Sequence, residues 1–168
     1  LKAIEIISKS LRGAVANTPE GREGMALGQY IAGMGFSNVG LGIAHSMAHT
    51  LGAVYDTPHG VANSLFLPYI MEFNIPACPE RFADIADAMG IEREESMSDE
   101  QYALKAVEYV KALNRKLNIP TIKEIKGITE ERFEAIAERS ANNVLSNDNA
   151  RKITKEDYLE LLKKAYNE

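Results

Sequence analysis

The sequence predicts an all-α protein, a helical bundle of roughly eight helices. Apolar residues recur three and four positions apart along most of the chain, which is the spacing of one helix face. Capping residues, prolines and glycines separate these segments, and no stretch alternates apolar and polar residues as a half-buried strand does. We therefore expect a single helical, metal-binding domain over residues 1–168, with mostly antiparallel neighbouring helices.

The first helix is expected from the first residue onward, because one face carries Leu1, Ile4, Ile7 and Leu11. No capping residue precedes this pattern, so we expect further sequence upstream in a parent protein. Thr18 and Pro19 have the types preferred at the N-cap and first position of a helix. They predict a second helix that runs to about Val39.

The third helix is predicted from about Leu41 to Val54, and the fourth from Pro58 through Phe73. Thr57 has the type expected at the N-cap of the fourth helix. Pro68 lies inside that helix and removes one backbone donor, which predicts a kink or a stop near Phe66.

The remaining helices are predicted mainly from their caps. A short helix spans residues 80–89, and a longer one spans about 99–117, with Ser98 as its cap and Gln101 completing a capping box. Thr129 is expected to cap the next helix, and Thr154 with Asp157 the last.

Composition excludes several classes of partner. The 168 residues are 45% hydrophobic and 26% charged, as in ordinary soluble domains. Lys and Arg total 19 against 24 Asp and Glu, and no basic patch with aromatic residues occurs, so we expect no nucleic acid partner. No signal peptide or apolar run of about 18 residues occurs, so we expect no membrane partner. The single Cys78 is compatible with a reducing cytoplasm, where we expect the protein.

The three histidines of the chain lie within fifteen residues of one another. His45 and His49 are four positions apart in an apolar helical segment, so both rings leave the same face. His59 follows ten residues later, and a tight corner would return it to the other two. Imidazoles in apolar surroundings need partners, which are either backbone carbonyls or a divalent metal ion.

Two neighbouring motifs carry no chemistry of their own. His45 to His49 has the spacing of a zinc-protease helix, but Ser46 stands where that mechanism needs a glutamate base. A set of glycines loosely matches a dinucleotide loop, although no strand precedes them: Gly33, Gly35, Gly40 and Gly42. We expect these glycines to allow close packing between helices.

The stretch GMGFSNVGLGIAHSMAHTLG at 33–52, followed by TPHGVAN at 57–63, resembles the iron-containing alcohol dehydrogenases. Within that family the likeness is greatest to the lactaldehyde (1,2-propanediol) reductases. The resemblance implies a dehydroquinate synthase-like C-terminal domain, with His45 and His59 as metal ligands and His49 in the catalytic cleft. It also places Phe36 in an aromatic wall of the substrate pocket, although an aromatic residue at helical spacing is as readily plain core.

The resemblance implies a metal-binding half of an NAD(P)-dependent dehydrogenase or reductase that acts on small alcohols, diols or aldehydes. Iron is the favoured metal, although imidazole ligands also suit zinc, nickel and cobalt. The family's Gly-rich phosphate loop, and an Asp and a His that complete its metal site, have no counterpart here. NAD or NADP would therefore be bound mainly by a missing N-terminal nucleotide-binding domain.

Two further expectations concern the whole protein. We expect the isolated chain to be inactive and the parent protein to be a homo-oligomer. The alternative is a catalytically silent helical fragment or interaction module that retains an incomplete metal site.

Overall fold

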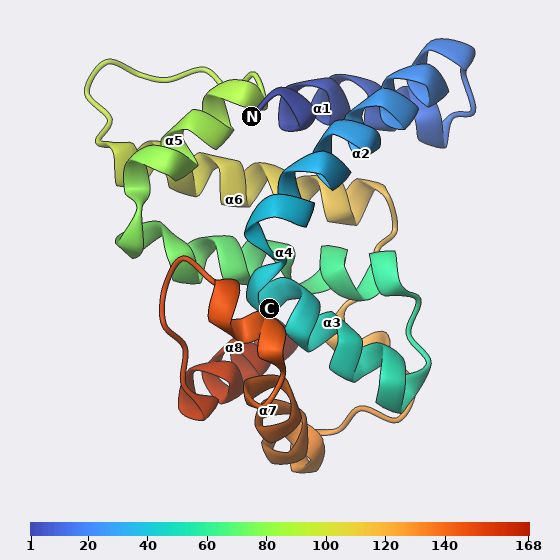
Figure 1. Ribbon diagram of the computed structural model, residues 1–168, viewed down its shortest axis with the longest axis vertical. Coiled ribbons are helices and arrows are strands. Elements are labelled where there is room, and N and C mark those ends of the chain that lie inside the picture. Colours follow the sequence, from blue (N-terminus) through green and yellow to red (C-terminus); the bar gives the residue numbers. More distant parts are fainter. The chain divides into compact units, whose positions relative to one another are not determined.

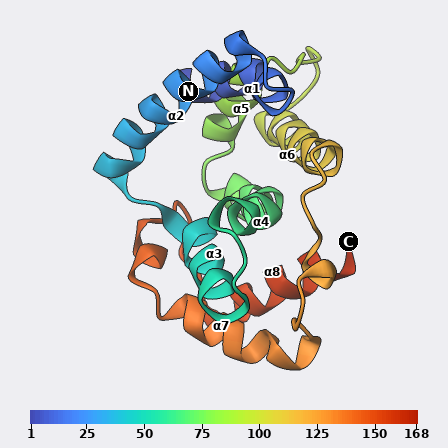
Figure 2. The same cartoon turned by 90° about the vertical axis from the view of Figure 1, so that its right-hand side faces the viewer.

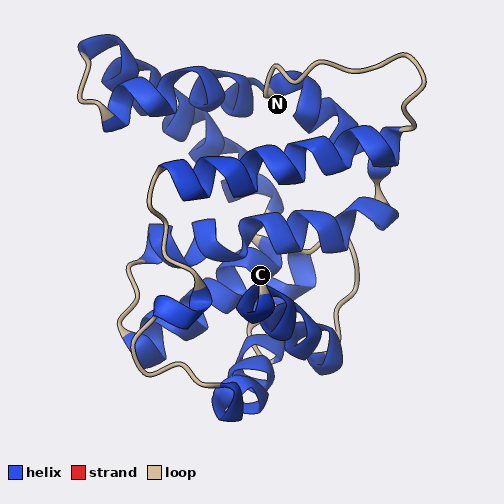
Figure 3. Ribbon diagram, turned by 180° about the vertical axis from the view of Figure 1, so that it is seen from behind, coloured by secondary structure: helices blue, strands red, loops and turns tan.

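The computed structural model describes residues 1–168 and contains helices and loops without a strand (Figure 3). The α-helices are α1 (Lys2–Val15), α2 (Pro19–Val39), α3 (Gly42–Tyr55), α4 (His59–Asn74), α5 (Pro79–Ala88), α6 (Asp99–Lys116), α7 (Phe133–Ala141) and α8 (Lys155–Asn167) (Figure 1). Four short 3-10 helices join them: η1 (Ile75–Ala77), η2 (Ile122–Glu124), η3 (Glu130–Arg132) and η4 (Val144–Asp148). The predicted all-α fold of about eight helices is confirmed. None of these helices has the length and apolar character needed to cross a membrane.

Contacts between residues divide the chain into two compact units. Unit 1 contains 1–40 and 78–106, and unit 2 contains 41–77 and 107–168. The long helix α6 therefore contributes its first part to unit 1 and its second part to unit 2. All three histidines belong to unit 2, whereas Phe36 belongs to unit 1.

Unit 1 is built on a close pairing of α1 with α2, the two helices at the blue end of the chain in Figure 1. Thr18 accepts a hydrogen bond from the Gly21 amide at 3.2 Å, which confirms the predicted N-cap of α2. A Cβ atom at Gly21 would collide with the backbone of Gly13, and one at Gly28 would lie 2.7 Å from Cγ1 of Ile7. Glycine on α2 is therefore what lets the two helices touch.

The four glycines for which we expected close packing behave differently. A Cβ atom at Gly35 would meet nothing within 4 Å, and one at Gly33 would meet only a ring atom of Phe36 at 3.9 Å. Gly40 and Gly42 have positive φ angles of 83° and 71°, a backbone conformation that glycine adopts more readily than other residues. The expectation of close helix packing is therefore wrong for Gly33 and Gly35, because the contacts of α2 with α1 are made by other glycines.

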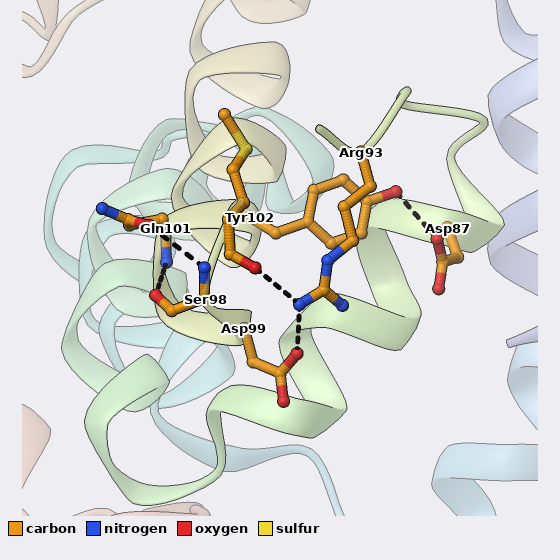
Figure 4. Close-up of polar contacts among 7 residues, drawn as sticks. Asp87, Arg93, Ser98, Asp99, Gln101 and Tyr102 are labelled. Carbon is orange, nitrogen blue, oxygen red and sulfur yellow. Dashed lines mark hydrogen bonds and ion pairs between the residues drawn. The ribbon is translucent and has the colours of Figure 1, made fainter. Parts of the chain in front are cut away.

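The second part of unit 1 joins α5 to the start of α6 (Figure 4). Ser98 and Gln101 exchange hydrogen bonds of 3.1 and 3.2 Å, so the predicted capping box of α6 is confirmed. The hydroxyl of the buried Tyr102 donates a hydrogen bond to the Asp87 carboxylate at 2.8 Å. The Arg93 guanidinium lies over the Tyr102 ring, 5.1 Å from its centre. Burial and the Asp87 carboxylate raise the pKa of Tyr102 to about 12. These contacts fix the start of α6 on α5.

Unit 2 holds the hydrophobic core that supports the histidine segment, and Figure 2 shows α3, α4, α7 and α8 around it. Large side chains from all four helices are buried there: Ile43, Met47, Leu51, Phe66, Phe133, Ile136, Tyr158 and Leu162. The predicted capping box of α8 is confirmed, because Thr154 and Asp157 bond reciprocally. Thr129 is the N-cap residue of η3, which leads directly into α7, so the predicted position is confirmed, but its side chain makes no capping hydrogen bond.

A buried network of hydroxyl groups ties α3 to the C-terminal helices. The Ser46 hydroxyl lies 2.7 Å from the Tyr158 hydroxyl and donates to the Ser140 carbonyl at 3.2 Å. The Tyr158 hydroxyl also lies 2.7 Å from that of Ser146, and Ser140 donates to Thr50 at 3.1 Å. The helix that carries His45 and His49 is therefore held by satisfied polar contacts as well as by the core.

The loop before α8 is held against the end of α4. Asn74 and Asn149 exchange two amide hydrogen bonds of 3.1 and 2.7 Å. Arg151 donates to the Phe73 carbonyl at 3.0 Å, and its guanidinium lies 4.1 Å from the centre of the Phe73 ring. A Cβ atom at Gly42 would lie 3.3 Å from the Asn149 side-chain oxygen, so this loop also lies against the start of α3.

Helix α4 continues through Pro68, so of the two predicted outcomes near Phe66, a kink or a stop, the stop does not occur. A proline at this position leaves the carbonyl of Ser64, one turn earlier, without its usual helical donor. The Asn114 side chain on α6 donates to that carbonyl at 2.6 Å. A long-range side-chain contact thus replaces the missing backbone bond, and the helix that begins at His59 is not interrupted.

Candidate metal and substrate site

The site begins with the sharp corner between α3 and α4. Helix α3 ends at Tyr55, and Asp56 takes the left-handed conformation with φ of 52°. Helix α4 begins at His59 with Pro58 in the capping position. The predicted N-cap role of Thr57 is therefore wrong, since its buried hydroxyl oxygen has no hydrogen-bond partner. Only three residues separate the two helices, which returns the chain to the face that carries the other histidines.

The structure brings the three imidazole rings together at this corner. The ring centres of His45 and His49 are 6.0 Å apart, with the planes nearly perpendicular at 89°. The ring centre of His59 lies 5.1 Å from that of His45 and 5.4 Å from that of His49. One small ligand could therefore meet nitrogen atoms from both helices.

His45 is the half-buried member of the group, while His49 and His59 are exposed. Its Nδ1 atom is buried and has no hydrogen-bond partner. Burial first, and then the neighbouring His59 and His49, lower the pKa of His45 below its ordinary value of 6.5. The Leu41 carbonyl opposes this shift. This shift favours the neutral form of His45, which is the form that binds a metal ion.

His59 is held by a residue of its own helix. The side-chain nitrogen of Asn63, one turn later, donates to the His59 carbonyl at 3.0 Å and lies 3.2 Å from Nε2 of its ring. The Asn63 side-chain oxygen is buried without a partner. The sequence carried no signal for this contact beyond the position of Asn63 on the same helix face as His59.

The buried side-chain atoms without partners provide a test of whether a ligand fits. Three such atoms occur, on His45, Thr57 and Asn63, and all three residues belong to α3, α4 or their connection. Buried polar groups without partners are rare in native proteins and commonly mark the place of a water molecule or ion. A neutral imidazole is also the commonest protein ligand of divalent metals. The chemistry of this corner therefore fits a metal ion.

The donor set in this chain is nevertheless incomplete. No group of three or more His, Cys, Asp or Glu side chains is arranged to hold a metal ion, despite the proximity of the three rings. Metal sites in proteins commonly use three or four protein ligands. Additional ligands are therefore needed if two of these histidines bind metal.

Phe36, the other predicted site residue, lies near the end of α2 with 46% of its surface exposed. It is thus not plain core within unit 1, which was the alternative interpretation of its position. Its role in a substrate pocket stays a prediction.

Comparisons with known proteins agree on one family. A family model for the C-terminal part of the Fe-containing alcohol dehydrogenases matches residues 1–166. The chain is 49% identical to lactaldehyde reductase of Escherichia coli (strain K12) over 166 residues, which is 99% of this chain and 43% of that protein. It is 38% identical to 1,3-propanediol dehydrogenase of Citrobacter freundii over 168 residues, again 99% of this chain and 43% of that protein.

A solved structure supports the same relationship. The alcohol dehydrogenase from Oenococcus oeni superposes with a TM-score of 0.93 and 42% sequence identity, over 98% of this chain and 43% of that one. The chain thus spans less than half the length of these relatives, and it matches them over almost all of its own residues.

Proposed function

The chain belongs to the iron-containing alcohol dehydrogenase family, and from that membership we propose that it is the metal-binding helical part of an NAD(P)-dependent alcohol dehydrogenase or aldehyde reductase. The observation that carries the proposal is the cluster of three imidazole rings, with centres 5.1–6.0 Å apart. The similar proteins include a lactaldehyde reductase and a 1,3-propanediol dehydrogenase. Small alcohols, diols and aldehydes are accordingly the proposed substrates.

His45 and His59 would hold the metal ion, as the resemblance to the family implies, and their ring centres lie 5.1 Å apart. The lowered pKa of His45 supports this assignment, since a protonated imidazole cannot bind a metal. Iron is the proposed metal, with zinc, nickel or cobalt as alternatives that suit the same ligands. The remaining ligands would come from a nucleotide-binding domain that precedes this chain in the full-length protein.

When bound, the metal ion would polarise the substrate oxygen and the nicotinamide cofactor would exchange a hydride with the substrate carbon. The exposed ring of His49 lies within 5.4 Å of His59, centre to centre, and is proposed to transfer a proton at the edge of this cleft. The core beneath α3 orients both His45 and His49, since Met47 and Leu51 on that helix are fully buried. Phe36 is proposed to bound the substrate pocket through its exposed ring.

We place this activity in a reducing cytoplasm, because the only cysteine, Cys78, is not part of a disulfide. Binding of NAD or NADP is assigned mainly to the preceding domain.

A second candidate is a catalytically silent helical module that retains an incomplete metal site. It is favoured because no three His, Cys, Asp or Glu side chains of this chain are arranged to hold a metal ion. The two candidates differ in whether the full-length protein turns over substrate.

The test is an assay of the full-length protein with NAD or NADP and with 1,2-propanediol, 1,3-propanediol or ethanol. We expect turnover that is lost after chelation and restored most strongly by ferrous ion. Absence of turnover with every metal, from a protein that still binds the cofactor, would favour the silent module instead.

A further inference from the structure

A second cavity of unit 2 lies between the C-terminal half of α3 and helix α7 and shares no lining residue with the histidine cluster. Its volume is about 360 Å³. Arg132 and Arg139 line it, and no acidic side chain does. Two cations thus share one cavity in a chain whose net charge is −5.

Neither guanidinium is neutralised by the protein. No hydrogen bond or ion pair joins Arg132 or Arg139 to another side chain. The nearby carboxylates of Glu134 and Glu138 are instead bound to Lys155, at 3.1 and 3.0 Å. The acidic residues of α7 are therefore used elsewhere, which leaves the two arginines available to a ligand.

Other cavities of unit 2 show a different charge arrangement. One is lined by Lys111 and Arg115 and also by the carboxylate of Glu168, which pairs with Lys111 at 2.6 Å. Another contains Lys164, which is paired with Glu72 at 2.6 Å. In both, at least one carboxylate lines the cavity and pairs with its lysine. The arginine cavity lacks that counter-charge.

The spacing of the two arginines limits the kind of anion. Arg132 ends η3 and Arg139 lies on α7, seven positions further along the chain, and both line the same cavity. Ala135 and Ile136 lie between them, and Val54 of α3 lines the same cavity. Two positive groups are thus separated by an apolar surface. A molecule that matches this surface has two negative groups joined by an apolar segment.

We propose that this cavity binds a small organic dianion in which two carboxylates are separated by a short aliphatic chain, such as glutarate or adipate. Each carboxylate pairs with one guanidinium, whose planar donor geometry suits a carboxylate well. The aliphatic chain contacts Ala135, Ile136 and Val54. The Thr50 hydroxyl adds little, because it already bonds to Ser140 and to the Ser46 carbonyl. This site is independent of the proposed metal-dependent activity.

The test is calorimetric titration of the purified protein with glutarate, adipate, propionate and inorganic phosphate at constant ionic strength. We expect the dicarboxylates to bind at least about tenfold more tightly than propionate, since only they engage both guanidiniums. Arg132→Gln and Arg139→Gln should each remove this advantage. The matched control is Arg22→Gln, since Arg22 is an exposed arginine of unit 1 that bonds to Asn17 and should not affect binding when changed.

Three outcomes would overturn the proposal. Equal affinity for propionate and the dicarboxylates would show that the arginines do not act together. Preference for phosphate would identify a single anion centre instead. Thermal destabilisation of both glutamine variants, with no dicarboxylate binding to the unchanged protein, would show that the arginines only stabilise the C-terminus of α3. All variants change exposed side chains, and circular dichroism verifies that they fold.

Discussion

His45 differs from its two neighbours because its ring is partly removed from water while theirs are exposed. Desolvation penalises the charged imidazolium, and the two nearby histidines add to the penalty when they are protonated. The same environment leaves Nδ1 without a partner. A single residue thus combines a bias towards the neutral form with an unsatisfied nitrogen.

At this scale we predict that the pKa of His45 in the metal-free protein lies below 6.5. Protonation of His45 should then lower the free energy of unfolding. A depressed pKa in the folded state means that the unfolded chain binds more protons. The contribution of His45 to stability is therefore complete above pH 6.5 and is lost as the pH falls through the folded pKa. NMR titration of the His45 ring in the presence of a chelator measures its pKa. A midpoint at or above 6.5 would contradict the burial argument.

Single residues also show what the sequence could predict. The caps by Thr18, Ser98 and Thr154 were predictable because both partners lie within three positions. The contact between Ser46 and Tyr158 joins residues 112 positions apart, and no local pattern reports such a partner. Thr57 has the right type for a cap, but α4 begins at His59 with Pro58 in the N-cap position, and the Thr57 hydroxyl has no hydrogen-bond partner.

At the scale of elements, α2 offers two glycines in opposite environments. Gly21 lies against the backbone of Gly13, while Gly35 has open space around its missing side chain. We predict that Gly21→Ala destabilises the protein by about 1–3 kcal/mol through overpacking. Gly35→Ala should stabilise it by about 0.5–1 kcal/mol through helix propensity. Urea denaturation measures both variants, and equal effects would contradict the packing of α1 on α2.

The continuity of α4 through Pro68 gives a second prediction. Asn114→Ala should destabilise the protein by about 1–2 kcal/mol, because the Ser64 carbonyl loses its only replacement donor. In a Pro68→Ala background the backbone donor returns, so the same change should cost less than about 0.5 kcal/mol. Asn38→Ala is the control, since Asn38 also donates to a helix carbonyl, at 2.6 Å, but on an exposed surface. Additive effects of Pro68→Ala and Asn114→Ala would show that the contact does not compensate for the proline.

Elements were more predictable from the sequence than their contacts. Periodicity and caps predicted α2 and α6 to within one residue of their ends, because both signals are local. The continuation of α4 through Pro68 was not predictable from local sequence, because Asn114 reaches α4 from a different helix. The division of the chain within α6 was likewise not visible, since the helical pattern is continuous across Ala106.

At the scale of the whole molecule, the chain combines a well-formed core with an incomplete set of metal ligands. We predict that the isolated 168-residue chain folds without metal, because a core of many buried apolar side chains outweighs a two-histidine site. It should purify largely metal-free and show no NAD-dependent turnover. Circular dichroism with and without a chelator should give the same helical spectrum. Unfolding by the chelator would show instead that the metal is structural and its site complete.

The central claim is that His45 and His59 hold the metal ion while His49 acts beside it. The most direct measurement is the metal content of the full-length protein and of its His45→Ala, His49→Ala and His59→Ala variants, together with their rates. We expect the first and third variants to lose bound metal and activity together. His49→Ala should retain the metal and react more slowly, with an altered pH dependence. Loss of metal in His49→Ala, or its retention in His45→Ala or His59→Ala, would contradict the account.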